Sequence, residues 1–382
     1  MISERVPLSG LTTLRVGGPA ARFTEVRTAE DLVDAVRGAD AAGEPLLVLG
    51  GGSNIVVSDD GFAGTVLRVA TTGITVHEAG DQVLITVAAG ENWDRLVEWS
   101  VAEKLAGLEC LVGIPGLTGA TPIQNVGAYG QDVGATITTV TVLDRASASV
   151  TTLAGATCGF GYRTSLFKRT AWPQPPARPG QGMMRAPGPT GRYVVLNVTF
   201  GLERDPMSGP VRYAELAARL GVGIGDRAPL DEVRTAVLEL RRGKGMVLDP
   251  ADPDTVSVGS FFTNPVFSHD ELARLERVVS ARLPGARVPT YPAQSQTRPG
   301  GESRRGCVKV PAAWLIEQAG FGKGYPGCGA ARISSKHTLA LTNAAGGSAA
   351  DLIDLARQIA AGVRSAFGIE LAHEPVLVGL TL

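Results

Sequence analysis

Residues 45–54 read Pro45-Leu46-Leu47-Val48-Leu49-Gly50-Gly51-Gly52-Ser53-Asn54, a run of large apolar side chains that passes directly into three glycines. The apolar run predicts a buried strand, and the glycines predict a turn at its end. Glycines permit positive φ and expose backbone N–H groups, so such a turn suits a phosphate or pyrophosphate. It matches neither the GxGxxG fingerprint nor a P-loop, and an ordinary tight turn has the same kind of residues.

Helices and strands are mixed on both sides of this turn. We expect helices at 31–42, 91–105, 229–243 and 351–367, and strands at 45–49, 65–70, 83–88, 193–200 and 374–379. The mixture indicates an α/β or α+β architecture. In the helix at 229–243, Pro229 suits an early position and Gly243 suits the residue just past the end. Residues 172–192 hold six prolines without a helical or strand period, which predicts an irregular excursion.

Composition excludes several classes of protein. The 382 residues carry a formal net charge of −1, without the basic surplus of a nucleic-acid-binding protein. No run of 18 apolar residues predicts a membrane helix, and Met1 to Gly10 do not resemble a secretory signal. The four cysteines form no CxxC pair, so we expect no metal site and reduced thiols in a cytoplasmic protein.

Polar groups that suit a ligand gather in two further segments of the first half. Residues 111–116 and 121–130 mix glycines with Thr, Gln, Asn and Tyr, which can hold a flat polar ring system against the backbone; a structured loop is the alternative. In residues 161–168, the guanidinium of Arg163 beside Tyr162 can hold a carboxylate bidentately; a surface arginine is the alternative.

Two segments of the second half suggest proton chemistry. Ser260 lies between a glycine and two phenylalanines, outside any GxSxG elbow, so it is a candidate proton donor rather than a hydrolase nucleophile. A hydroxyl serves as an acid only where neighbours stabilise the alkoxide, and Glu374 before the last strand is a candidate neighbour. For both residues a cap or a structural hydrogen bond is the alternative.

Taken in order, these segments resemble the UDP-N-acetylenolpyruvoylglucosamine reductase family over about residues 11–379. The matching runs are Gly50-Gly51-Gly52-Ser53-Asn54, Gly113-Ile114-Pro115-Gly116, Pro122-Ile123-Gln124-Asn125-Val126-Gly127-Ala128-Tyr129-Gly130, Tyr162-Arg163, Gly259-Ser260-Phe261-Phe262, residues 313–320 and Glu374-Pro375. The resemblance implies an α+β fold with a two-part FAD-binding domain of the vanillyl-alcohol-oxidase type and a C-terminal α+β substrate-binding domain.

The resemblance also implies roles for individual residues. The expected catalytic residues are Ser260, Arg163 and Glu374. The expected contacts of non-covalent FAD are Gly50, Gly51, Gly52, Ser53, Asn54, Ile114, Pro115, Gly116, Thr121, Gln124, Asn125, Gly127, Ala128, Tyr129 and Arg241. The expected contacts of the sugar nucleotide are Tyr162, Tyr213, Lys244, Asn264, Tyr291, Lys323 and His337, with Tyr213 on a loop that folds over the substrate.

The implied reaction is reduction of UDP-N-acetylglucosamine enolpyruvate by NADPH through FAD. Hydride from the flavin would reach C3 of the enolpyruvyl group, and Ser260 would deliver a proton to C2. Arg163 and a protonated Glu374 would stabilise the charge that develops on the carboxylate. We expect a monomer without nucleic-acid or membrane partners.

Two other functions compete with this one. An oxidase of small alcohols with the same FAD fold predicts turnover with oxygen. A nucleotide sensor predicts FAD binding without substrate-dependent oxidation of NADPH.

The expected domains are residues 1–70 and 71–208 for FAD, the latter with the insertion at 172–192, and residues 209–368 for substrate. A C-terminal strand in 369–382 is expected to return to the active site.

Overall fold

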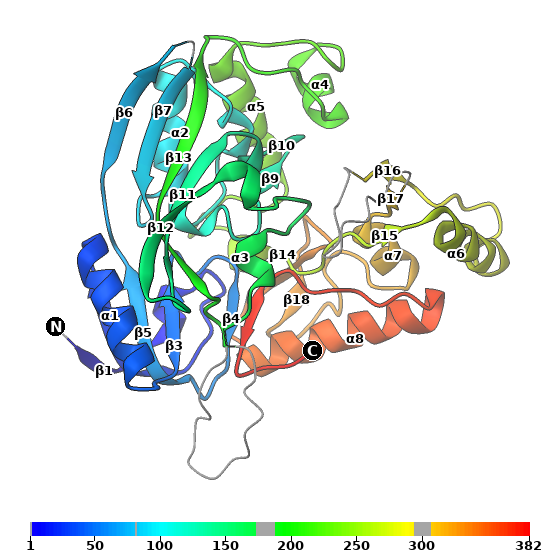
Figure 1. Cartoon of the computed structure of the whole chain (residues 1–382). Helices are drawn as coiled ribbons and strands as arrows, with labels where there is room; N and C mark the ends of the chain where they lie inside the picture. Colours follow the sequence, from blue (N-terminus) through cyan, green and yellow to red (C-terminus); the bar gives the residue numbers. More distant parts are fainter. Residues whose placement is uncertain (1, 81, 173–187, 294–306) are drawn as a thin grey trace. The chain divides into compact units, whose positions relative to one another are not determined.

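The computed structural model describes residues 2–80, 82–172, 188–293 and 307–382. Most of the predicted irregular excursion, 173–187, lies outside the described residues. The chain divides into two units (Figure 1). The first unit comprises residues 1–8, 19–52 and 61–248, and the second comprises residues 9–18, 53–60 and 249–382. In the described ranges, no helix has the length and apolar character needed to cross a membrane.

The first unit contains a four-stranded sheet, and one of its strands leads into the glycine turn. Its order is β1-β2-β5-β3, with β1 antiparallel to β2 and the other neighbours parallel. The strands are β1 (Ser3–Pro7), β2 (Pro19–Val26), β3 (Leu46–Leu49) and β5 (Phe62–Val69). Helix α1 (Ala29–Ala41) contacts β2, β3 and β5 through the apolar face that includes Leu32 and Val36. The predicted strand at 45–49 therefore corresponds to β3, which ends immediately before Gly50.

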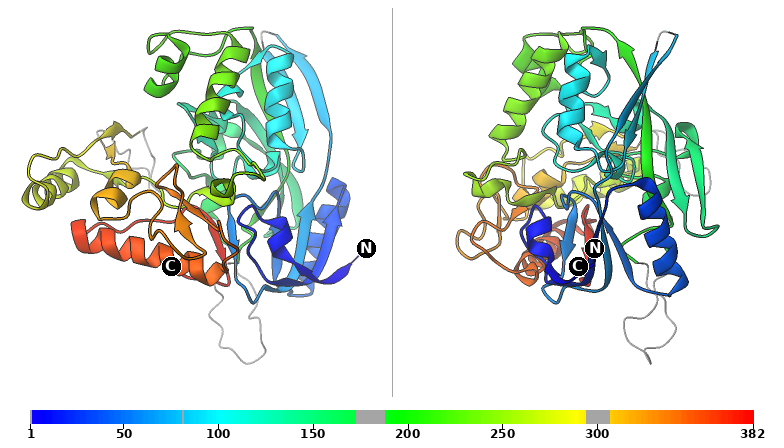
Figure 2. Two further views of the ribbon diagram at one scale, coloured as in Figure 1. Left: turned by 180° about the vertical axis from the view of Figure 1, so that it is seen from behind. Right: turned by 90° about the vertical axis from the view of Figure 1, so that its left-hand side faces the viewer.

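The first unit also contains a larger sheet. Its order is β12-β11-β13-β7-β6, and β8 pairs with β13. The strands are β6 (Ile74–Ala79), β7 (Gln82–Ala88), β8 (Leu105–Ala106), β11 (Ile137–Asp144), β12 (Ser149–Ala154) and β13 (Tyr193–Arg204). Helices α2 (Trp93–Ala102) and α5 (Leu230–Gly243) stand together beside this sheet (Figure 2). Trp93 and Phe200, both fully buried, contact each other in the core with ring centroids 5.9 Å apart.

Residues 209–248 pack with the first unit rather than with the chain that follows. Helix α4 (Ala214–Leu220) buries Leu216, and α5 buries Val233 and Val237, in the same apolar core as β7 and β13. Residues 209–248, which were predicted to open the substrate-binding domain, thus lie in the first structural unit, and the second unit resumes at Asp249. The amphipathic pattern of α5 predicted a helix correctly but carried no information about which core it joins.

The end of α5 also differs from the expectation. Pro229 precedes the first helical residue, as expected for an early position. Gly243, however, still belongs to the helix, and Gly245 takes the left-handed conformation, with φ of 65°. Gly243 is therefore the last residue of α5, and the glycine with positive φ comes two residues later.

The second unit contains three small sheets and three helices. The sheets have the orders β14-β19-β18, β15-β17-β16 and β20-β4. Their strands are β4 (Ile55–Val57), β14 (Ser257–Ser260), β15 (Val266–Phe267), β16 (Tyr291–Pro292), β17 (Val308–Lys309), β18 (Arg332–Ile333), β19 (Ala340–Thr342) and β20 (Val376–Val378). The helices are α6 (His269–Arg282), α7 (Ala312–Gln318) and α8 (Ala349–Phe367).

Residues distant in sequence hold the second unit together. β20 pairs in parallel with β4, so the predicted C-terminal strand lies beside Ile55–Val57. The carboxylate of Asp59 accepts hydrogen bonds from the first two backbone N–H groups of α8, Ala349 at 2.8 Å and Ala350 at 3.0 Å. A capping box between Ser348 and Asp351 adds to that helix start. The predicted α+β fold class is confirmed, because helices are combined with several separate sheets in which antiparallel pairs predominate.

A pH-dependent contribution to stability arises at the end of β11. Arg192 donates two hydrogen bonds to the carboxylate of Asp144, at 2.7 and 2.6 Å, and this contact holds the pKa of Asp144 below its ordinary value. A folded-state pKa below the unfolded value stabilises the fold above the unfolded pKa of about 3.9. That contribution is lost as the pH falls through the folded pKa.

Asp144→Asn is therefore expected to lower the free energy of unfolding at pH 7. The difference from wild type should shrink as the pH falls from about 5 towards 3, because the wild-type carboxylate then gains a proton. Denaturant unfolding across this range measures it. Asp34→Asn, at an exposed carboxylate on α1, is the control and should track wild type. A difference that does not change with pH would show that Asp144 acts through its shape rather than its charge.

Candidate active site

The first unit brings two of the predicted cofactor-binding segments together. The glycine turn after β3 and the segment 113–116 approach so closely that a Cβ on Gly51 would lie 2.8 Å from the Cα of Gly116. Trp93 at the start of α2 fixes the second segment, because its backbone N–H donates to the carbonyl of Gly116 at 3.2 Å. Two stretches of exposed backbone therefore lie side by side, as a bound pyrophosphate requires. The boundary between the units falls after Gly52, so Ser53 and Asn54 belong to the second unit.

The segment 121–129 is held by its own polar side chains. The amide of Asn125 donates to the carbonyl of Gly161 at 3.0 Å and accepts from the N–H of Gly134 at 2.8 Å. The side-chain oxygen of Gln124 accepts from Lys168 at 3.2 Å, and the hydroxyl of Thr121 donates to the carbonyl of Thr118 at 2.8 Å. These contacts fix the course of the backbone. Gly127 then opens the short hairpin of β9 (Gly127–Ala128) and β10 (Gln131–Asp132), in which Ala128 lies opposite Gln131.

Three of the predicted site residues adopt positive φ, which is uncommon for side chains other than glycine. The φ values are 47° at Asn125, 51° at Tyr129 and 51° at Arg163. Such conformations cost free energy and gather where function demands a particular geometry. Arg163 is also held by a hydrogen bond of 2.8 Å to the carbonyl of Gly127, and its guanidinium lies 5.7 Å from the centre of the Tyr162 ring. Its charge is therefore fixed beside the 127–129 backbone.

Arg241 on α5 is a buried cation next to the same region. It donates to the carbonyl of Gly113 at 3.2 Å and to that of Met246 at 2.8 Å. Burial lowers the pKa of Arg241 to about 10, so the side chain still carries its charge at neutral pH. Its Nε is buried and has no hydrogen-bond partner among the described residues. A buried, unsatisfied donor of this kind fits a polar group of a bound ligand.

An aromatic and charged cluster lies beside Arg241 in the sequence, at the same C-terminal end of α5. Lys244 pairs with Glu215 on α4 at 2.5 Å, and its ammonium lies 5.5 Å from the centre of the Tyr129 ring. Tyr129 in turn meets Tyr213 edge to face, with ring centroids 5.2 Å apart. The structure thus brings the predicted residues Tyr129, Tyr213 and Lys244 together. Glu215 was missed by the sequence reasoning, although it stands only two residues after Tyr213.

The second unit brings Ser260 and Glu374 onto hydrogen-bonded backbone segments. The N–H of Glu374 donates to the carbonyl of Phe261 at 2.8 Å, and Phe262 bridges to His373. Phe261 and Phe262 are almost fully buried, so they anchor the strand end that presents Ser260. Neither Ser260 nor Glu374 is fully buried, which leaves both side chains accessible to a ligand.

The remaining predicted substrate contacts occupy different parts of the second unit. The side-chain oxygen of Asn264 accepts from the N–H of Ala312 at the start of α7, at 2.9 Å. The carbonyl of His337 accepts from the N–H of Ala340, which lies opposite Ser260 in the β14–β19 pair. Tyr291 on β16 is 58% exposed, and Lys323 lies in the exposed loop after α7. His337 is thus tied to the strand opposite Ser260, whereas Asn264 is tied to the start of α7, and Tyr291 lies opposite Lys309 on β17.

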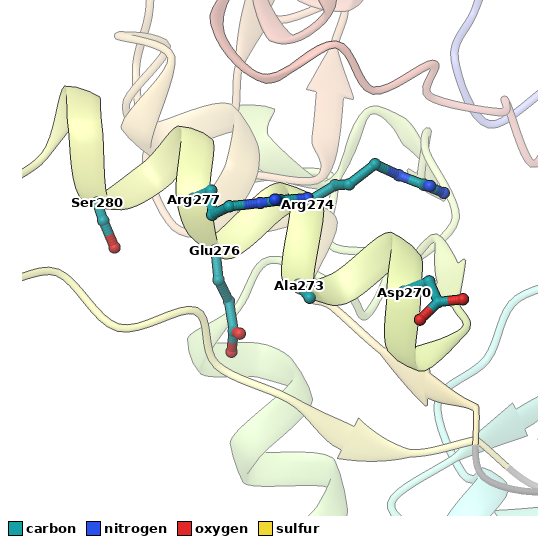
Figure 3. A pocket seen from close by; sticks show the side chains of 6 residues that line it. All are labelled: Asp270, Ala273, Arg274, Glu276, Arg277 and Ser280. Atoms are coloured by element: carbon teal, nitrogen blue, oxygen red, sulfur yellow. The ribbon is translucent and has the colours of Figure 1, made fainter.

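Two surface hollows in the second unit lie away from these residues. One follows α6 and is lined by Asp270, Ala273, Arg274, Glu276, Arg277 and Ser280 (Figure 3). The other is lined by Arg15, Pro250, Pro253, Val256, Asn343, Ala344, Gly346 and Gly347. Neither hollow includes a predicted site residue in its described lining. In the part of the chain that the structure describes, no group of three or more His, Cys, Asp or Glu side chains is arranged to hold a metal ion.

Two family models match the chain, and each falls largely within one part of it. The model described as FAD binding domain matches residues 20–154, and the model described as UDP-N-acetylenolpyruvoylglucosamine reductase, C-terminal domain, matches residues 250–378. The first match covers the glycine turn and the segments 113–116 and 121–129. The second covers Ser260 and Glu374.

Similar proteins span nearly the whole chain. UDP-N-acetylenolpyruvoylglucosamine reductase of Thermobifida fusca is 52% identical, over 100% of this chain and 99% of its own length. The reductase of the same name from Streptomyces coelicolor is 52% identical, over 98% of this chain and 90% of its own length. Among solved structures, UDP-N-acetylenolpyruvylglucosamine reductase from Thermus caldophilus aligns with a TM-score of 0.59 at 24% identity, covering 99% of this chain and 100% of that one. At this identity the structural likeness supports the fold alone.

Proposed function

This chain belongs to the UDP-N-acetylenolpyruvoylglucosamine reductase family, and from that premise we propose that it reduces UDP-N-acetylglucosamine enolpyruvate to UDP-N-acetylmuramate with NADPH. The family resemblance predicted from the sequence is confirmed by these relatives. The chain is an FAD-dependent oxidoreductase of peptidoglycan synthesis. The proposal adds the reductant, the course of the reaction and the roles of individual residues.

The residues of the first unit fit FAD. The observation that carries this fit is the close approach of Gly51 to Gly116, because two backbone segments in contact leave no room for side chains between them and their ligand. The buried Nε of Arg241 offers a further donor beside Gly113. We therefore assign the pyrophosphate to residues 50–52 and 114–116 of the first unit, and Ser53 and Asn54 remain FAD contacts that the family resemblance implies. The ring system goes to residues 121–129 and Arg241.

When bound and reduced, FAD supplies the hydride that adds to C3 of the enolpyruvyl group. Ser260 donates a proton from its hydroxyl to C2, which completes the lactyl ether. A serine hydroxyl is a very weak acid, so it needs a partner that stabilises the oxygen it leaves behind. A protonated Glu374 is suited to this, because a neutral carboxyl group can donate a hydrogen bond and the backbone N–H of Glu374 is bonded to the residue after Ser260.

Arg163 stabilises the negative charge that develops on the substrate carboxylate. Its positive φ, its bond to Gly127 and its stacking near Tyr162 hold the guanidinium in place before the reaction. A charge that is already oriented costs no reorganisation when the transition state forms. Tyr162, Tyr213, Lys244, Asn264, Tyr291, Lys323 and His337 complete the proposed contacts with the sugar nucleotide. Lys244 and Lys323 serve its diphosphate and carboxylate.

We further propose that the enzyme is cytoplasmic and monomeric. Cys110, Cys158, Cys307 and Cys328 are all free, which accords with a reducing compartment. Burial raises the pKa of Cys158 to about 11, so that thiol stays protonated and unreactive at neutral pH. Light scattering of the purified protein measures the oligomeric state and should give the mass of one chain.

The test of the proposed function is NADPH oxidation by the purified protein. We expect a yellow preparation that oxidises more than one equivalent of NADPH per flavin rapidly only after UDP-N-acetylglucosamine enolpyruvate is added. Turnover that instead follows oxygen and a small alcohol would support an oxidase. A yellow protein without substrate-dependent oxidation would support a nucleotide sensor. A folded but colourless protein that cannot take up FAD would contradict every one of these assignments.

A further inference from the structure

The ammonium of Lys244 is already engaged by an anion within the chain. Lys244 follows the last helical residue of α5, and Glu215 lies in the first turn of α4. Their Nζ and Oε2 atoms are 2.5 Å apart. The side chains of Lys244 and Glu215 are 31% and 41% exposed, so both reach solvent and any anion dissolved in it.

The surroundings of this pair belong to the proposed substrate site. The Lys244 ammonium lies 5.5 Å from the centre of the Tyr129 ring, and Tyr129 contacts Tyr213 edge to face. Tyr213 immediately precedes α4, and Glu215 lies in the first turn of that helix. Burial alone would lower the pKa of Lys244, but the hydrogen bond that Lys244 donates to Glu215 and the negative charge of Glu215 help to outweigh that effect, so the pKa is raised. The carboxylate therefore does for Lys244 what a bound phosphate would do.

A carboxylate and a diphosphate cannot both take the best position on one ammonium. Glu215 is tethered to the protein, so it competes at every ligand concentration, whereas a free anion must displace it. A partly exposed ion pair is worth little, which corresponds to about a two- to fivefold change in an equilibrium constant. A singly charged anion gains little from the exchange. A diphosphate carries more charge and more acceptor oxygens, and so gains more.

We propose that Glu215 is a competing internal anion, which occupies Lys244 until a nucleoside diphosphate displaces it. This inference rests on the proposed function, in which Lys244 contacts the diphosphate of the substrate. Glu215 acts through Lys244, so it is a positioning residue rather than a catalytic one.

Glu215→Gln tests the competition, since glutamine keeps the shape and an acceptor oxygen but removes the charge. The probe is UDP, titrated calorimetrically into the FAD-loaded protein. The variant should bind UDP about two- to fivefold more tightly than wild type, whereas its affinity for uridine, which has no phosphate, should not change. The advantage should shrink between about 0.05 M and 0.5 M KCl, because salt screens exposed charges.

The fold offers a matched control. Arg219 and Glu239 form a second ion pair between α4 and α5, with side chains 52% and 45% exposed. Glu239→Gln loosens the same two helices without touching Lys244, so it should leave UDP affinity at the wild-type value. In a Lys244→Met background, Glu215→Gln should bring no gain, since the cation for which the two anions compete is gone.

The outcomes separate this inference from the proposed function. If Glu215 served only to orient Lys244, Glu215→Gln would bind UDP as weakly as wild type or more weakly, and the inference would be overturned. UDP binding too weak to measure in both proteins would overturn it as well. The proposed function fails on a different result, namely wild-type protein that oxidises no NADPH when the enolpyruvyl substrate is added. In an active enzyme, the variant should lower KM for that substrate without changing the rate of flavin reduction by NADPH.

Discussion

Ser260→Ala is expected to leave reduction of the bound flavin by NADPH close to the wild-type rate, while reoxidation by UDP-N-acetylglucosamine enolpyruvate slows by about 10³-fold or more. Only the second half-reaction needs a proton at C2, and alanine has none to give. The variant should fold normally, because Phe261 and Phe262 anchor that strand end and the backbone bond from Glu374 is unchanged. Stopped-flow absorbance of the flavin measures the two steps separately.

A second serine on the same strand supplies the control. Ser257 opens β14, is buried, and its hydroxyl accepts a hydrogen bond from the N–H of Gly259. Ser257→Ala should slow neither half-reaction by more than a few fold, even if it lowers the melting temperature. If Ser260→Ala slowed both half-reactions equally, the hydroxyl would be serving cofactor binding or local structure, and its assignment as the proton donor would be wrong.

Gly51→Ala is expected to weaken the binding of FAD. The added Cβ would lie 2.8 Å from the Cα and 3.3 Å from the carbonyl carbon of Gly116, and backbone atoms at both ends leave no flexible side chain to move aside. Overpacking of this kind costs about 1–3 kcal/mol, so FAD should bind roughly 5- to 150-fold more weakly. The flavin absorbance per protein after gel filtration, and titration of the apoprotein with FAD, give the loss.

Gly38→Ala on α1 is the matched glycine substitution, because a Cβ there meets no atom within 4 Å. Alanine is also the better helix former, so this variant should keep its flavin and be at least as stable as wild type. Wild-type flavin content in Gly51→Ala would mean that the two backbone segments separate freely, and the proposed pyrophosphate site would then have to lie elsewhere.

Local elements with a strong period could be predicted from the sequence. Apolar residues at helical spacing located α1, α2, α5 and α8 to within a few residues. The apolar run before the glycine turn likewise located β3. These elements are determined by which face must be buried, and that information lies within a dozen consecutive residues.

Features that depend on distant contacts could not be predicted in this way. Nothing in Ile55–Val57 reveals that its partner is a strand more than 300 positions later, or that this pairing removes residues 53–60 from the unit around them. The same holds for α4 and α5, because their apolar patterns alone do not reveal that they pack in the core of the first unit. The pair between Lys244 and Glu215 also depends on tertiary structure, because it joins the ends of two helices.

The candidate site likewise has features that local motifs predict and features that depend on distant contacts. The motifs around Gly51, Asn125 and Ser260 were recognisable because each carries unusual residues in a fixed order. Their resemblance to a family supplied roles that the residues alone left open between function and local structure. What the structure adds is how these residues are held, as in the two bonds of the Asn125 amide and the buried cation at Arg241.

The most direct test of the central claim is a single turnover without oxygen. The FAD-loaded enzyme is first bleached with one equivalent of NADPH and then mixed with UDP-N-acetylglucosamine enolpyruvate under nitrogen. The account predicts that the yellow colour returns rapidly, with one UDP-N-acetylmuramate formed per flavin. It would be contradicted if the colour returned only when oxygen was admitted, or if the reduced enzyme ignored the enolpyruvyl sugar nucleotide altogether.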